Sequence, residues 1–221
     1  MRSRFTPLLA LLAATSLGAC IPYAVGSTAR TLPAGTHTKT STAFVIPNAF
    51  DRKEDSTAAT MPGLDYELRY GIDARSDFGV RIPSWSGVVV NYKHRIDATP
   101  SSQAADTGTA VSLMAGGGFV NWGQHAEGEL TLIASAREDR PIVPYGGARV
   151  VQVVPLSRDV PSDRPTAGAF FGARFGNGEA TITPELGVYY DHSALGIRRS
   201  DVIFVPSISF RGDLLSSVFH H

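Results

Sequence analysis

Strict alternation of apolar and charged residues over residues 62–83 constrains this chain more than any other feature. In PGLDYELRYGIDARSDFGVRIP, every second position outside residues 74–77 is apolar, and the positions between include Asp65, Glu67 and Arg69. Side chains of a β-strand point to opposite faces with a period of two residues, so the pattern predicts a hairpin with one apolar and one charged face. A short polar turn at residues 74–77 joins its two strands.

Similar alternation recurs to the C-terminal end and predicts ten strands. The expected strands cover about residues 41–50, 64–72, 78–82, 86–96, 109–121, 127–136, 142–153, 166–175, 181–190 and 201–210. Pro47 interrupts the first, which suits a bulged or edge-like position. Gly146-Gly147 interrupts the seventh, where a bulge could shift the parity, so the direction of Arg149 stays open. No helical pattern follows residue 20.

The N-terminal residues have the pattern of a secretion signal. Arg2 and Arg4 precede an apolar core and small residues, and the sequence Leu17-Gly18-Ala19-Cys20 resembles the lipobox of bacterial lipoproteins. This resemblance implies a signal peptide over residues 1–19, acylation such as palmitate at Cys20, and a lipid-anchored flexible tether over residues 20–40. The alternative is an ordinary signal peptide with an incidental cysteine, although Cys20 is the only cysteine of the chain.

Charge and hydropathy exclude two other classes of protein. Removing Arg2 and Arg4 leaves 18 basic and 20 acidic residues, without a basic stripe, so nucleic acid is not an expected partner. After residue 20, no apolar run approaches the ~20 residues of a membrane-spanning helix.

The strand pattern favours a transmembrane barrel. Strands near ten residues suit tilted transmembrane strands, and an even number lets the sheet close without an exposed edge. The chain is therefore similar to small bacterial outer-membrane proteins: an all-β, single antiparallel up-and-down β-barrel over residues 41–221. The alternative is a lipid-tethered periplasmic β-sandwich or lipocalin-like domain that binds an apolar ligand, in which the apolar parity forms the core.

In a membrane barrel, a mixed set of charges would face the lumen and form ion pairs. The set is Glu67, Arg69, Arg81, Lys93, Arg95, Glu129, Arg174 and Glu185. Because about eight strands enclose just enough room for side chains, ten strands with long charged residues predict a largely filled lumen. We therefore expect a structural or narrow-transport role, with membrane lipid as partner and lipopolysaccharide or a small solute as further candidates. On this interpretation Glu67→Gln should be mild and Leu68→Arg disruptive.

An enzyme acting on lipid A or peptides is the third hypothesis. It would need an acid and a histidine converging at one rim, and the nearest candidates are Asp191 and His192 with His125. Adjacent strand residues face opposite ways, and the spacing matches no barrel-enzyme motif. The sequence predicts no catalytic site, no metal site and no cofactor.

Overall fold

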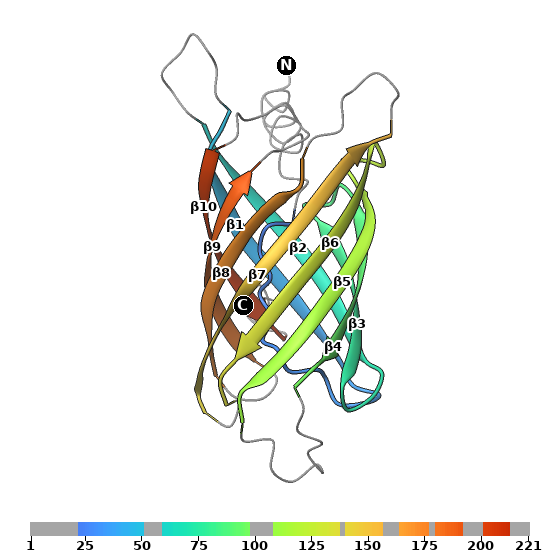
Figure 1. Cartoon of the computed structure of the whole chain (residues 1–221), viewed down its shortest axis with the longest axis vertical. Coiled ribbons are helices and arrows are strands. Elements are labelled where there is room, and N and C mark those ends of the chain that lie inside the picture. Colours follow the sequence, from blue (N-terminus) through green and yellow to red (C-terminus); the bar gives the residue numbers. More distant parts are fainter. Residues whose placement is uncertain are drawn as a thin grey trace, which may run out of the picture.

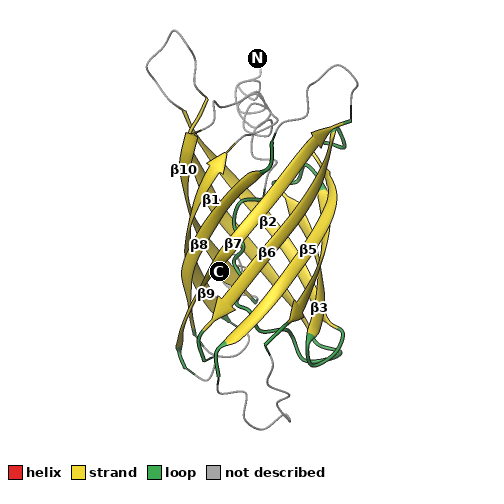
Figure 2. Cartoon of the chain, viewed as in Figure 1, coloured by secondary structure: helices red, strands yellow, loops and turns green. Residues whose placement is uncertain are grey.

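Ten antiparallel strands close into one barrel in the computed structural model of the chain (Figure 1). The structure describes residues 22–50, 59–97, 108–137, 140–156, 164–176, 180–191 and 201–212. Within these ranges the regular elements are strands (Figure 2), and no helix is long and apolar enough to cross a membrane. The all-β barrel and its ten strands, both predicted from alternation, are confirmed.

Neighbouring strands in the sequence are neighbours in the barrel, and β1 pairs with β10 to close it. The strands are β1 (His37–Phe50), β2 (Ala59–Gly71), β3 (Ser76–Pro83), β4 (Val88–Arg95), β5 (Ala110–Val120), β6 (His125–Ser135), β7 (Ile142–Pro155), β8 (Thr166–Phe175), β9 (Thr181–Asp191) and β10 (Asp201–Arg211). We call the end at which β1 begins and β10 ends the lower rim, and the opposite end the upper rim, as they appear in Figure 1.

The register between β1 and β2 shifts from Ile46 to Phe50, around Pro47. Proline has no backbone N–H to donate to a neighbouring strand, so an irregularity at this position is expected. Of the two positions that suited Pro47, bulged or edge-like, the structure shows the bulged one.

Gly146 and Gly147 do not shift the parity of β7. This strand pairs with β6 and β8 in continuous register, and Arg149 points into the barrel. A Cβ added to Gly147 would lie 1.8 Å from the carbonyl oxygen of Leu132 and 2.9 Å from the ring of Phe170. Glycine here provides room for close packing and not for a bulge, and the direction of Arg149, which the sequence left open, is inward.

Apolar side chains cover the outer wall of the barrel. Leu68 is 43% exposed, whereas its neighbours Glu67 and Arg69 are buried. The same outward apolar pattern includes Leu64, Val90, Leu113, Leu130 and Val150. A sandwich or lipocalin-like domain would bury this face as its core, so the alternative of a tethered periplasmic domain is wrong.

Exposed aromatic side chains gather toward both rims of the outer wall. Toward the upper rim these are Trp85, Phe119, Trp122, Tyr190 and Phe204, and toward the lower rim they are Tyr70, Phe78, Tyr92 and Phe175. Such rings of aromatic residues are typical of the two interfaces of a transmembrane barrel, with an apolar band between them.

Residues 22–32, which we call the lumen segment, run through the inside of the barrel (Figure 1). Near the upper rim, the ring of Tyr23 lies 5.4 Å from that of Tyr189 on β9. Near the lower rim, the backbone nitrogen of Leu32 donates to Asp77 at the start of β3. The segment therefore passes from the upper to the lower rim.

This path corrects the flexible tether predicted over residues 20–40. Within the described part of that range, the lumen segment is enclosed by the barrel, and β1 already begins at His37. The segment has no periodicity because it is neither a strand nor a helix. Side chains of the barrel wall, and not a neighbouring strand, satisfy much of its backbone.

Two apolar clusters share the lumen with polar residues. The upper cluster contains Tyr23, Phe44, Ile46, Met61, Val89, Val120, Val151, Val153, Tyr189, Ile203 and Val205. The second cluster, on the side of β5 to β8, contains Val25, Ala29, Ala110, Met114, Ile133, Tyr145 and Phe170. The upper cluster lies next to the upper rim, at the level of the buried Asp65 and Glu127, which pair in register with Pro83 and Val153.

Candidate functional site in the barrel lumen

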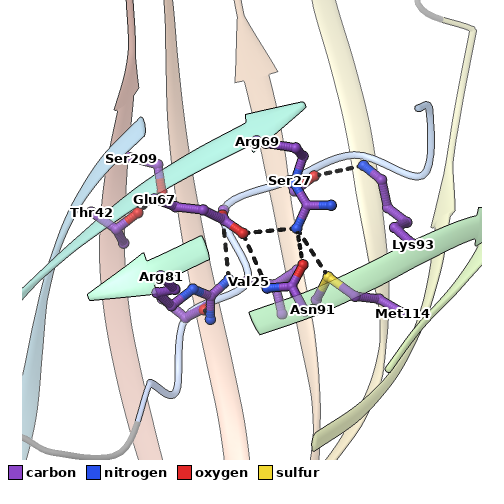
Figure 3. Close-up of polar contacts among 12 residues, drawn as sticks. Val25, Ser27, Thr42, Glu67, Arg69, Arg81, Asn91, Lys93, Met114 and Ser209 are labelled. Atoms are coloured by element: carbon purple, nitrogen blue, oxygen red, sulfur yellow. Dashed lines mark hydrogen bonds and ion pairs between the residues drawn. The ribbon is translucent and has the colours of Figure 1, made fainter. Parts of the chain in front are cut away.

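A chain of buried ion pairs crosses β2, β3 and β4 (Figure 3). Arg69 donates to Glu67 over 2.7 Å and also pairs with Asp77. Glu67 accepts a further hydrogen bond of 3.2 Å from the amide of Asn91 and lies 3.5 Å from the guanidinium of Arg81. Removing water from charges is unfavourable unless they are paired and hydrogen-bonded, and here each carboxylate has more than one partner.

Two arginines donate to a single peptide carbonyl of the lumen segment. Arg81 on β3 and Arg149 on β7 reach the carbonyl oxygen of Ala24 over 3.3 and 3.1 Å. Arg149 also pairs with Glu129, and both of these side chains are fully buried. The two strands lie on different sides of the lumen, so Ala24 is held between two parts of the wall.

Glu185 on β9 binds the backbone of the lumen segment directly. Its carboxylate accepts hydrogen bonds from the backbone nitrogens of Val25 and Gly26, over 2.8 and 3.0 Å. The hydroxyl of Tyr145 donates a third bond of 2.7 Å. Hydrogen bonds to an ionised acceptor are stronger than neutral ones, so this carboxylate is a main attachment point of the segment.

Lys93 on β4 holds the lower half of the lumen segment. Its ammonium group donates to the hydroxyl of Ser27 over 3.1 Å and to the carbonyl oxygens of Thr28 and Arg30 over 3.2 and 2.7 Å. Asp77 lies 3.6 Å away and balances its charge. An ammonium has three donors, and three acceptors of the lumen segment lie within reach.

Several other buried oxygens lack hydrogen-bond partners within the described part of the chain. Neither carboxylate oxygen of Glu127 accepts a hydrogen bond, and the same holds for Oδ2 of Asp65 and Oε1 of Glu129. Glu127 and Glu185 are each 5% exposed, yet Glu185 accepts three hydrogen bonds and Glu127 accepts none within the described residues. The lumen therefore contains both fully satisfied and unsatisfied glutamates.

The eight charges predicted to face the lumen have three kinds of surroundings. Six lie in the contacts described above: Glu67, Arg69, Arg81, Lys93, Glu129 and Glu185. Arg174 is half-buried and lines a cavity near the lower rim. Arg95 pairs with Asp97 beyond the end of β4, and hydrogen bonds from Arg95 lower the pKa of Asp97. Cys20 lies outside the described residues.

Sequence reasoning missed several buried charges. Asp77, Arg149 and Glu127 are buried in the lumen, and the first two have ion-pair partners. Parity could have found Asp77, which shares the phase of Gly79 and Arg81 but was assigned to the turn. It could also have found Glu127, which shares the phase of Glu129.

The described part of the structure does not bring the catalytic candidates Asp191, His192 and His125 together. His125, at the start of β6, lies 3.2 Å from the side-chain amide of Asn121, and no acid is bonded to it within the described ranges. Asp191 ends β9, but its side chain, like His192, lies outside what the structure describes. No group of three or more His, Cys, Asp or Glu side chains could hold a metal ion among the described residues.

The closed antiparallel barrel, its apolar outer wall and its charged interior define a transmembrane β-barrel of the outer-membrane type. No protein-family model matches the chain, and no curated protein matches it.

An outer-membrane channel of known structure shares this fold. An outer membrane channel from Pseudomonas putida F1 aligns with a TM-score of 0.52 at 8% identity, over 83% of this chain and 97% of that chain. The outer membrane protein OprG from Pseudomonas aeruginosa aligns with a TM-score of 0.31 at 10% identity, over 84% of this chain and 99% of the other. Neisserial surface protein A aligns with a TM-score of 0.32 at 14% identity, over 80% of this chain and 95% of that chain. At 8% identity, the likeness to the channel from Pseudomonas putida F1 concerns the fold alone.

Proposed function

We propose that this protein is a lipid-anchored outer-membrane barrel with a structural or narrow-transport role, and that its own lumen segment closes it to passive diffusion. The observation that carries the proposal is the attachment of that segment to the wall on several sides. Glu185, Lys93 and Asp77 bind its backbone from β9, β4 and β3. A chain bound in this way leaves no room for the continuous water column of a general porin.

Two further features support this proposal. Ten strands enclose a lumen far narrower than the 16 or more of open aqueous porins. The upper apolar cluster, which includes Tyr23, Val89 and Ile203, fills part of the same lumen with apolar side chains. Solutes could pass only if the lumen segment moved. A narrow-transport role requires such a movement, and a purely structural role does not.

Ion conductance in planar lipid bilayers tests the closed state. The wild-type protein should give no stable conductance steps. A variant in which residues 22–32 are replaced by a Gly-Ser sequence of equal length should conduct, because a flexible chain lacks the side chains of Tyr23, Val25 and Leu32 that pack in the lumen. Both proteins should keep the anomalous migration of a folded barrel in unboiled SDS samples. Porin-like conductance of the wild type would refute the proposal.

A further inference from the structure

A hydrogen-bonded group of polar side chains lies on the outer wall of the barrel, close to the lower rim. Ser76 begins β3, and His94 pairs with it in register near the end of β4. Both residues have the outward parity of Phe78 and Tyr92, which pair with each other two positions further along the same strands. The group therefore lies outside the lumen, where the apolar outer wall ends.

Ser76 connects the rings of two residues of β4. The hydroxyl of Tyr92 donates to Oγ of Ser76 over 2.8 Å, and the same Oγ lies 2.9 Å from Nδ1 of His94. The rings of Tyr92 and His94 are stacked, with centroids 6.2 Å apart and planes inclined by 11°. Ser76 is only 2% exposed, so it orients the imidazole and is not accessible to a substrate.

This arrangement leaves one ring nitrogen of His94 for a group from outside the barrel. Nδ1 is occupied by Ser76, and Nε2 has no partner among the described residues. When Nδ1 accepts the serine hydroxyl, the imidazole carries its hydrogen on Nε2 and donates from there. His94 is half-buried, and its neighbour in register on β5, Leu113, is exposed.

Arg75 adds a positive charge beside this group. It directly precedes β3, and its Nη2 donates to the carbonyl oxygens of Arg95 and Asp97 over 3.1 and 2.9 Å. Because Arg95 follows His94 in the chain, the guanidinium is held next to the imidazole. No acid pairs with this guanidinium in the described part of the chain: Asp73 accepts the backbone N–H of Arg75, and the carboxylate of Asp97 pairs with Arg95. The remaining N–H groups of the exposed Arg75 are available to a ligand.

The surroundings of these donors indicate which ligand suits them. Toward the middle of the barrel, the outer wall beside them is apolar, with exposed Phe78, Val90 and Leu113. The strands end on their other side, so the donors lie at the border between the apolar wall and water, where the lipid headgroups of a bilayer lie. Guanidinium and imidazole N–H groups both donate to phosphate oxygens, and the single charge of Arg75 matches that of a phosphodiester.

We propose that Arg75 and His94 form a binding site for the phosphate group of an anionic phospholipid, whose acyl chains lie along the apolar wall beside β3, β4 and β5. Ser76 and Tyr92 are positioning residues, because they hold the imidazole. The inference goes beyond the closed barrel proposed above, since it concerns the outer wall and does not depend on the lumen segment.

Native mass spectrometry of the full chain, folded in detergent, tests this site by counting bound lipids. The wild type should retain one phosphatidylglycerol per chain and should retain phosphatidylcholine less well. Arg75→Gln and His94→Phe should each weaken the binding of phosphatidylglycerol by roughly ten-fold, the effect of losing one hydrogen bond to a charged group. His94→Phe keeps an aromatic ring beside Tyr92, so the outer wall stays packed.

Tyr92→Phe tests the positioning role. It removes only the hydroxyl that donates to Ser76. We expect a several-fold smaller preference for phosphatidylglycerol over phosphatidylcholine, with unchanged unfolding in urea. A purely structural role of this hydroxyl would change the unfolding and leave the lipid preference as it is.

Lys39→Gln is the matched control, because Lys39 is an exposed cation near the lower end of β1, away from this site. Lipid binding should be unchanged in this variant, and an equal loss would mean that the lipid responds to net charge alone. Equal retention of the two lipids by the wild type would overturn the proposal, as would normal binding by both Arg75→Gln and His94→Phe. Complete displacement of the lipid by an excess of inorganic phosphate would indicate a site for free phosphate and not for a lipid. Arg75→Lys, which keeps the charge, should bind better than Arg75→Gln.

Discussion

Glu185 and Val25 are 160 residues apart in the chain, yet a hydrogen bond of 2.8 Å joins the backbone nitrogen of Val25 to the Glu185 carboxylate. This contact attaches the N-terminal part of the protein to the ninth strand of its barrel. The same carboxylate also accepts from Gly26 and Tyr145, so all its partners are donors. The lumen segment therefore depends on a negative charge at this position.

Glu185→Gln should consequently destabilise the folded protein. An amide offers one acceptor oxygen and directs its own N–H groups toward the donors of Val25 or Gly26. We expect a loss of about 1.5–3 kcal/mol, the range for hydrogen bonds to charged groups. Urea unfolding in detergent measures this value, and protease cleavage within residues 22–32 should increase.

Glu127→Gln is the matched control for that substitution. Glu127 is equally buried, but its carboxylate oxygens accept no hydrogen bond within the described part of the chain. Replacing a buried carboxyl group that accepts no hydrogen bond should leave stability nearly unchanged. If both substitutions destabilise the protein equally, the contacts of Glu185 are not what holds the lumen segment.

Gly26 provides a second test of the lumen segment. Its φ is +60°, and an added Cβ would lie 2.3 Å from the hydroxyl oxygen of Ser209. Gly26→Ala should therefore combine backbone strain with a steric clash. Gly35→Ala separates the two effects, because Gly35 has a φ of +77° with no atom within 4 Å of an added Cβ. We expect about 1–2 kcal/mol of destabilisation for Gly35→Ala and clearly more for Gly26→Ala. Equal effects would mean that the segment does not press against Ser209.

The alternation of the strands was enough to predict the barrel but not its contents. In residues 62–83, the parity placed Glu67 and Arg69 inside and Leu68 outside, as the structure has them. This succeeds because each side chain of a strand has only two possible faces. Periodicity carries no information about a segment whose partners are side chains such as Glu185, far away in the sequence.

Gly146-Gly147 shows a second limit of prediction from the sequence. Two glycines in a strand indicate either a bulge or a close approach of neighbouring atoms. The choice depends on Phe170, which packs over Gly147 from the next strand. A single sequence does not reveal that contact, so the direction of Arg149 could not be predicted from it.

Glu67 and Leu68 test the two faces of β2. Leu68→Arg places a charge on the lipid-facing wall, which costs about 2–4 kcal/mol near the midplane and less toward the interfaces. Glu67→Gln was expected to be mild from the sequence, but Glu67 is bonded to Arg69 and Asn91 and lies close to Arg81. We now expect it to destabilise the barrel as well, because a partner of buried guanidinium groups is lost.

Folding into lipid vesicles distinguishes a charge placed against lipid in Leu68→Arg from a lost ion-pair partner in Glu67→Gln. Leu68→Arg should lower the yield of the form that migrates as a folded barrel in unboiled SDS samples. Glu67→Gln should insert normally but unfold at lower urea concentration. Normal insertion and stability of Leu68→Arg would mean that this face does not meet lipid.

The lipid anchor is tested by replacing its acceptor. The sequence Leu17-Gly18-Ala19-Cys20 resembles a lipobox, and Cys20 is the only cysteine. Cys20→Ser should abolish labelling with radioactive palmitate and leave the precursor uncleaved by the lipoprotein signal peptidase. Unchanged labelling would exclude Cys20 as the acylated residue. The barrel itself should still fold, since its strands begin at His37.

The path of the lumen segment also predicts on which side of the membrane this anchor lies. Pro22 follows Cys20 by two residues in the sequence and is buried next to Tyr23 toward the upper rim, and two residues of chain span at most about 7 Å. β1 begins at the opposite, lower rim. If the lower rim, where β1 begins and β10 ends, faces the periplasm, the upper rim faces the cell surface. A lipid on Cys20 would then enter the outer leaflet.

Thiol labelling of intact cells decides between the two orientations. Gln124→Cys introduces a thiol at an exposed upper turn, and Ala74→Cys introduces one at an exposed lower turn. Acylated Cys20 has no free thiol, so the wild type provides the blank. A membrane-impermeant maleimide should label Gln124→Cys on intact cells and Ala74→Cys only after the outer membrane is permeabilised. The reverse pattern would place the lower rim at the cell surface and the upper rim in the periplasm. A lipid on Cys20 would then enter the periplasmic leaflet of the outer membrane.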